Sequence, residues 1–153
     1  MSSVAERILL ARTGKLVSDE PDEEAGSGRV LIADDNPVNA LIARRALESA
    51  GFTVSVAATG SEALDAAARM EPDLVLMDLR MPVMDGFEAM RRMRASGFSA
   101  PVIAVSAEMT PDIERRARDS GASGVAAKPL DAQALRALAL QWTAGAGRLT
   151  GAA

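Results

Sequence analysis

The 153-residue sequence contains neither cysteine nor histidine. Without cysteine the chain can form no disulfide, no thiolate nucleophile and no zinc–sulfur site. Without histidine it lacks the usual general base and the usual metal ligand, and it cannot carry a phosphohistidine of its own. Any chemistry must therefore use carboxylates, hydroxyls, lysine or arginine.

Aromatic residues are also scarce, with three Phe, one Trp and no Tyr, so the hydrophobic 48% of the chain is mostly aliphatic. The length suits one domain at about 150 residues per domain. The net charge of −4 argues against a surface for nucleic acid or anionic lipid. No apolar run approaches the roughly 18 residues of a membrane span, and the first residues do not resemble a signal peptide. We therefore expect a cytoplasmic monomer without membrane contact.

Composition divides the chain into three parts. Residues 1–28 end in acidic residues, Pro, Gly and Ser without apolar periodicity, which is typical of a flexible linker. Residues 29–144 contain regularly spaced apolar segments, whereas residues 145–153 predict a disordered tail. The sequence thus predicts one folded domain over 29–144, preceded by an acidic linker or the remnant of another domain.

Short apolar runs recur through the middle part and lack the period-two alternation of a half-exposed strand. Such runs favour strands buried on both faces of a parallel sheet. The five predicted strands are Arg29–Asp34, Phe52–Ala57, Asp73–Asp78, Ala100–Val105 and Ser123–Ala127.

Helical segments lie between these runs and carry start and stop signals. The start signals are Asn36 before Pro37, the capping box Thr59-Gly60-Ser61-Glu62, Gly86, Thr110 before Pro111, and Asp131, and the stop signals are Gly51 and Gly121. Five strand–helix units with right-handed crossovers predict an α/β fold, a doubly wound (βα)5 five-stranded parallel sheet.

Polar residues stand where the predicted strands end. Asp34 ends the first strand and Asp35 follows it, Asp78 ends the third, and Ser106 and Lys128 follow the fourth and fifth. Ligands of open parallel sheets bind at this edge. Three neighbouring carboxylates repel one another unless a cation joins them, and an oxygen-only donor set favours Mg²⁺. A hydroxyl and an ammonium beside such a site suit phosphoryl oxygens.

Four segments carry a resemblance to a known family. They resemble, in order, the first strand with its acidic pair, the phosphoacceptor segment, the fourth strand and the fifth strand of a bacterial response-regulator receiver domain. The segments are Val30–Asn39, Asp73–Gly86, Pro101–Ala107 and Gly121–Leu130. The resemblance covers residues 29 to about 144 and implies the flavodoxin-like receiver fold. The Asp-Asp-Asn-Pro-Val-Asn segment resembles the C-terminal receivers of hybrid histidine kinases in particular.

The resemblance implies a phosphoacceptor in a two-component phosphorelay, not an enzyme in the isolated chain. Asp78 would accept a phosphoryl group from a phosphohistidine on a histidine kinase or a phosphotransfer protein. Asp34 and Asp35 would hold Mg²⁺ together with Asp78 and the backbone carbonyl of Arg80.

The resemblance also assigns the remaining polar residues. Ser106 would move toward the acyl phosphate, and Lys128 would pair first with Asp78 and then with the phosphoryl oxygens. The bond between Lys128 and Pro129 is expected to be cis. The family's usual aromatic switch residue is replaced by Val125, which puts signalling through that ring in doubt.

Other interpretations remain open at this point. The chain could be a free-standing single-domain regulator or a receiver-like scaffold that is never phosphorylated. A haloacid-dehalogenase-type phosphatase would need an aspartate at position 80, where the chain has Arg80. A dinucleotide-binding module would need a glycine-rich turn after the first strand, where the chain has Asp-Asp-Asn-Pro.

Overall fold

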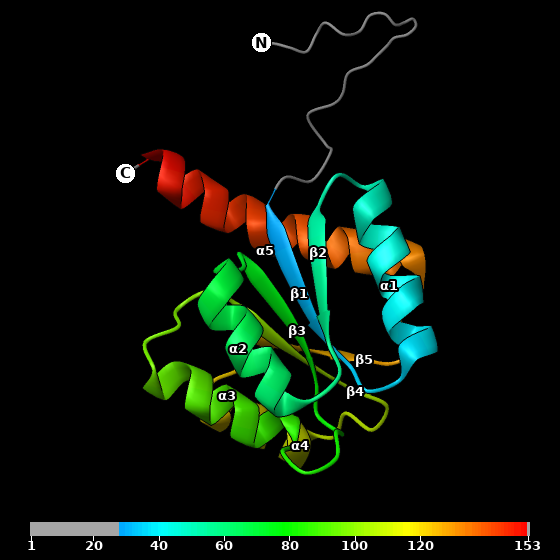
Figure 1. The fold of residues 1–153 in the computed structure, drawn as a ribbon, viewed down its shortest axis with the longest axis vertical. Coiled ribbons are helices and arrows are strands. Elements are labelled where there is room, and N and C mark those ends of the chain that lie inside the picture. Colours follow the sequence, from blue (N-terminus) through cyan, green and yellow to red (C-terminus); the bar gives the residue numbers. More distant parts are fainter. Residues whose placement is uncertain (1–27, 153) are drawn as a thin grey trace, which may run out of the picture.

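The computed structural model describes residues 28–152, with side chains described as far as Thr143 (Figure 1). Strands and helices alternate along the whole of this range. The elements are β1 (Arg29–Ala33), α1 (Pro37–Ser49), β2 (Thr53–Ala57), α2 (Gly60–Met70), β3 (Leu74–Asp78), α3 (Gly86–Ala95), β4 (Val102–Ser106), α4 (Pro111–Ser120), β5 (Gly124–Ala127) and α5 (Ala132–Ala152).

The five strands form one parallel sheet in the order β2-β1-β3-β4-β5. Helices α1 and α5 lie on one face, and α2, α3 and α4 lie on the other (Figure 1). The predicted α/β class and doubly wound (βα)5 topology are therefore confirmed, with strand bounds that differ from the predicted ones by one or two residues. Because β1 and β3 are neighbours, the residues that follow them meet at one edge of the sheet.

The strands in the middle of the sheet are buried on both faces, as their unbroken apolar sequences predict. All five residues of β3 and of β4 are buried. In β1, Val30 and Ile32 belong to the core under α1 and α5, and Leu31 and Ala33 belong to the core under α2 and α3. This double burial fixes the register and thus the position of the strand ends.

Side-chain oxygens cap the helices at their N-termini. Asn36, Thr59, Thr110 and Asp131 accept backbone N–H groups of the first helical turns, as predicted. The carboxylate of Glu62 accepts the N–H of Ala58, one residue earlier than in a regular capping box. Asp85 caps α3 by accepting the N–H of Glu88, so the start signal there is Asp85 together with Gly86.

The last helix is longer than the sequence predicts. α5 continues to Ala152, through most of the segment 145–153 for which the sequence predicts a disordered tail. This segment contains no proline to stop a helix, although three of its residues are glycines. The linker predicted over residues 1–28 lies, apart from Gly28, outside the described residues and stays a prediction. None of the described helices has the length and apolar character needed to cross a membrane.

Two glycines offer a test of how tightly the β3–α3 connection is packed. A Cβ on Gly86 would collide with the carbonyl oxygen of Asp78 and lie 2.8 Å from the Cα of Leu79. We expect Gly86→Ala to lower the free energy of unfolding by about 2 kcal/mol or more, because backbone must move. Gly97→Ala is the control, because no described atom outside its chain neighbours lies within 4 Å of the added Cβ. We expect it to lower the free energy of unfolding by only about 1 kcal/mol, which is the cost of the positive φ for alanine. Denaturant unfolding measures both, and equal losses would contradict this packing.

Candidate phosphoacceptor site

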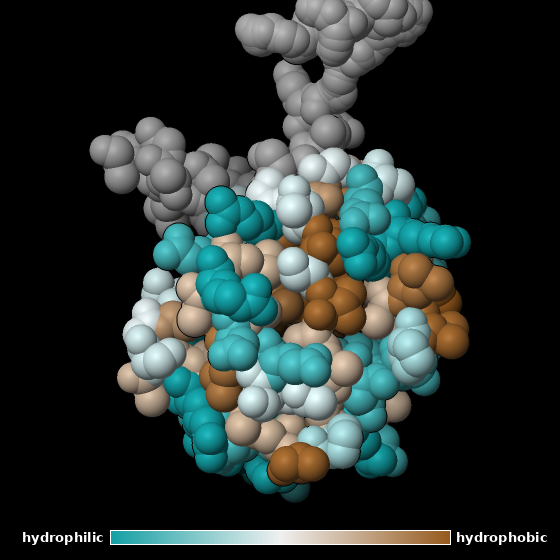
Figure 2. All heavy atoms as spheres, viewed as in Figure 1, coloured by the Kyte–Doolittle hydropathy of each residue, from teal (hydrophilic) through white to brown (hydrophobic). Residues whose placement is uncertain are grey.

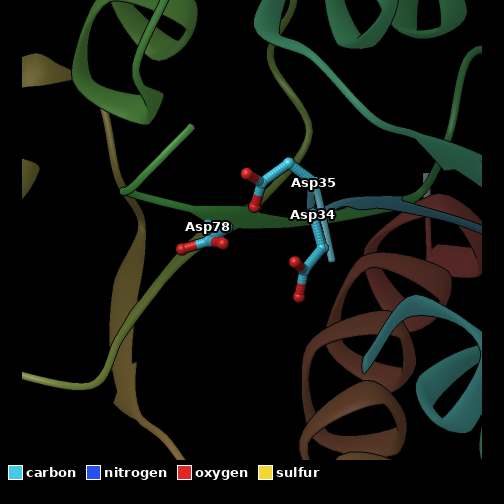
Figure 3. A group of neighbouring side chains, drawn as sticks. All are labelled: Asp34, Asp35 and Asp78. Carbon is cyan, nitrogen blue, oxygen red and sulfur yellow. The ribbon is translucent and has the colours of Figure 1, made fainter. Parts of the chain in front are cut away.

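Three carboxylates meet at the carboxyl ends of β1 and β3 (Figure 3). Oxygens of Asp34, Asp35 and Asp78 all lie within 4.8 Å of one another. Asp34 and Asp78 are buried, whereas Asp35 is exposed. The structure therefore brings together the three acids that the sequence places at strand ends, in a group with one open side.

Lys128 reaches this group from the end of β5. Its Nζ lies 3.3 Å from an oxygen of Asp78 and 3.5 Å from an oxygen of Asp34. The bond to Pro129 is cis, as the resemblance implied. The backbone N–H of Lys128 donates to the carbonyl of Ser106 at 2.9 Å. This hydrogen bond connects the start of the β5–α5 loop to the end of β4.

Ser106 stands at the end of β4, but its hydroxyl is engaged within its own loop. The hydroxyl oxygen accepts the backbone N–H of Glu108 at 3.2 Å, and the hydroxyl donates to the carbonyl of Glu108 at 3.5 Å. The residue is buried. In this arrangement Ser106 hydrogen-bonds to the β4–α4 loop and lies at the same sheet edge as Asp78.

An ion pair joins the two loops beside the acids. Arg80, after β3, donates to the carboxylate of Glu108, after β4, at 2.9 Å. The backbone N–H of Arg80 donates to Asp78 at 3.1 Å. Both side chains of the pair are exposed, so it contributes little stability, about 0–1 kcal/mol. The two residues lie 28 positions apart, and no local sequence pattern indicates that they touch.

A cleft of about 470 Å³ extends from the acids along α1. Asp34, Asp78 and Lys128 supply its polar end, and Ile42, Leu130 and Leu135 line its apolar part. Apolar side chains of α1 and the β5–α5 region thus lie beside the buried acids.

Comparison with known proteins identifies the arrangement. The sequence model of the response regulator receiver domain matches residues 30–140. The chain belongs to the receiver domain family. The predicted family is thus confirmed.

Curated relatives of this receiver domain include both long and short proteins. It is 38% identical over 113 residues to the sensory/regulatory protein RpfC of Xanthomonas campestris, covering 71% of the chain and 16% of the relative. It is 34% identical over 121 residues to the sensor histidine kinase RcsC of Escherichia coli, covering 79% of the chain and 12% of the relative. The two-component response regulator ORR41 of Oryza sativa is 42% identical over 113 residues, covering 70% of the chain and 87% of the relative. The chain therefore spans only a small part of the kinases that it matches.

Solved structures agree with this fold. The receiver domain of a sensor histidine kinase from Pseudomonas aeruginosa, which has a magnesium ion coordinated in its active-site cleft, matches with 31% identity and a TM-score of 0.71, over 78% of this chain and 99% of that one. The chemotaxis protein CheY4 of Vibrio cholerae matches with 29% identity and a TM-score of 0.71, over 76% of this chain and 99% of that one. The flavodoxin-like receiver fold is confirmed.

Asp78 lies in surroundings that oppose the ionisation of its carboxyl. Burial raises the pKa of its carboxyl above the ordinary value, and the nearby charge of Asp34 acts in the same direction. The N–H of Arg80 and the ammonium of Lys128 lower this pKa, but they do not outweigh burial. The ionised carboxylate of Asp78 is therefore held at a cost to folding when no cation is added.

This cost predicts the effect of removing the charge. A carboxyl whose pKa is higher in the folded protein binds more protons there than in the unfolded chain, so its contribution to stability falls as pH rises from the ordinary value through the raised one. In metal-free buffer at pH 7, we expect Asp78→Asn to raise the free energy of unfolding, because the amide removes the buried charge. Denaturant unfolding of both proteins measures this, with Asp65→Asn, at an exposed position on α2, as the control. A destabilised Asp78→Asn protein would contradict the electrostatic analysis.

Proposed function

We propose that Asp78 accepts a phosphoryl group from the phosphohistidine of a partner protein in a two-component phosphorelay, with Mg²⁺ at the neighbouring carboxylates. The observation that carries the proposal is the meeting of three carboxylates and one ammonium at Asp78. The family match and the hybrid-kinase relatives support the same function. Receiver domains are phosphoacceptors and not enzymes in the ordinary sense, and we extend this to the isolated chain.

The proposed transfer is a substitution at phosphorus. A carboxylate oxygen of Asp78 attacks the phosphorus, a P–O bond forms, and the P–N bond of the phosphohistidine breaks. The other ring nitrogen of the reacting phosphohistidine carries a proton, so when the electron pair of the broken bond stays on the imidazole nitrogen, the products are an acyl phosphate and a neutral histidine. The ammonium of Lys128 lies close enough to Asp78 to pair first with its carboxylate and then with the phosphoryl oxygens.

The residues present fit a magnesium ion. The donor atoms of Asp34, Asp35 and Asp78 are all oxygens, and a cation between them would reduce their mutual repulsion. Asp35 is exposed, so water can reach one side of the group. Mg²⁺ keeps several waters and takes few protein ligands, so the backbone carbonyl of Arg80 completes the proposed set. Bound there, the ion would neutralise phosphoryl oxygens during transfer. The magnesium-bound Pseudomonas receiver supports this assignment by analogy.

The exposed apolar surface supports a protein partner. Val38, Leu41 and Ile42 on α1 are exposed, and Figure 2 has a hydrophobic cluster over α1 at the right of the view. Ile42 also lines the cleft that leads to Asp78. We assign this surface to the histidine kinase or phosphotransfer protein that supplies the phosphoryl group. The net charge of −4 keeps the expectation of a monomer that binds no nucleic acid.

The relatives favour a receiver of a hybrid histidine kinase as the origin of the chain, and we keep the expectation of a cytoplasmic location. A free-standing regulator is the second candidate, because the chain covers 87% of the rice response regulator. Sequencing the gene and its surroundings separates the two: a kinase core in the same reading frame upstream of residue 1 supports the hybrid protein, and an independent transcript supports the free-standing one.

The acceptor assignment is tested by labelling with a small donor. Acetyl phosphate and Mg²⁺ should add one phosphoryl group to the wild type, and peptide mass spectrometry should place it on Asp78. Asp78→Asn should abolish the label, because an amide cannot form the acyl phosphate, whereas Asp85→Asn should keep it. Labelling of Asp78→Asn to the wild-type extent would show that another residue is the nucleophile.

The way in which the signal leaves the site is tested by an activated form. Ser106 can close on a phosphoryl oxygen with a hydrogen bond worth roughly 1.5–3 kcal/mol, which requires its loop to leave the present bonds to Glu108. Val125 has no ring to follow that motion and is restricted at χ1. We expect beryllofluoride to shift methyl and amide NMR signals of residues 79–86 and 107–110 and to leave the Val125 rotamer unchanged. A rearrangement centred on Val125 with the Ser106 loop unmoved would contradict this.

A further inference from the structure

Val83 has a backbone conformation that β-branched residues rarely adopt. Its φ is 70°, and the N–H of Met84 donates to the carbonyl of Pro82 at 2.7 Å, which closes a three-residue γ-turn of the strained, positive-φ kind. The other described residues with a clearly positive φ are four glycines and Glu71. A valine is therefore poorly suited to this position.

Backbone packing holds the turn on the side of α2. A Cβ on Gly60, at the start of α2, would lie 2.8 Å from the carbonyl oxygen of Met84. Strained conformations persist where the surroundings determine them in this way. Glycine or asparagine would adopt the same turn at a lower conformational cost.

The Val83 side chain contributes no packing that stabilises the fold. The residue is fully exposed, so no core packing offsets its strain. It follows Asp78 by only five residues, and the Asp78 carboxylate is just 8% exposed. Any protein that presents a phosphohistidine to Asp78 must come close to the loop that carries Val83.

We infer that Val83 is an apolar anchor for the phosphohistidine-bearing partner, which buries the side chain when it docks. This inference rests on the proposed phosphoacceptor function. The turn packs against α2 on one face of the sheet, whereas the exposed residues of α1 lie on the other face. The partner thus has apolar contacts on both flanks of Asp78. A side chain on a fixed turn loses little freedom on burial, which favours it as a contact.

The test compares two phosphoryl donors on the same variants. The phosphorylated histidine phosphotransfer proteins of the source genome are first screened, and the one that phosphorylates the wild type fastest serves as the protein donor. The small donor is acetyl phosphate. We expect Val83→Gly to slow transfer from the protein about fivefold and to leave acetyl phosphate labelling of Asp78 unchanged. Val83→Ile should retain rapid transfer from the protein. Val56→Thr, on the exposed edge strand β2, is the control and should match the wild type.

Each outcome decides the inference. The melting temperature of Val83→Gly should equal or exceed that of the wild type, and a lower one would show that the fold needs the valine. If the protein donor transfers its phosphoryl group to Val83→Gly as fast as to the wild type, Val83 is not an anchor, and the phosphoacceptor function remains intact. Failure of every phosphotransfer protein and of acetyl phosphate to label the wild type would overturn both.

Discussion

Mutual repulsion of Asp34, Asp35 and Asp78 is the constraint around which this receiver domain is built. Their carboxylate oxygens lie within 4.8 Å of one another, and like charges at such distances are costly in a partly dry cleft. One ammonium, that of Lys128, faces two of them. The arrangement therefore has an excess of negative charge that a divalent cation can relieve, and it places the most deeply buried carboxylate beside the only lysine of the folded domain.

The sheet makes this arrangement possible by holding the strand ends rigidly. β1 and β3 are neighbours with both faces covered, so the acids cannot move apart without disturbing the core. The loop that follows β4 is held by weaker contacts, because Ser106 bonds within its own loop and the ion pair between Arg80 and Glu108 is exposed. A rigid charge cluster beside such a loop is an arrangement in which a new phosphoryl group can change the loop while the sheet stays intact.

The sequence predicts the fold and the acids well, because unbroken apolar strands, caps and strand-end residues are local signals. It predicts less well the features that depend on contacts between residues far apart in the chain, and the point at which the last helix ends. The ion pair between Arg80 and Glu108 joins residues 28 positions apart, and the strain at Val83 follows from close backbone packing that no local pattern reveals. The continuation of α5 to Ala152 runs through glycines that suggested a tail.

Titration of Mg²⁺ followed by amide NMR shifts tests the central claim most directly, because it requires no partner, donor or label. The account predicts saturable shifts concentrated at residues 33–35 and 78–80, which weaken strongly in Asp35→Asn, the variant that removes the exposed carboxylate. The matched variant Asp65→Asn, on α2, should titrate like the wild type. Shifts spread over other acidic residues, or an Asp35→Asn response equal to that of the wild type, would contradict the claim that these three carboxylates form a magnesium site.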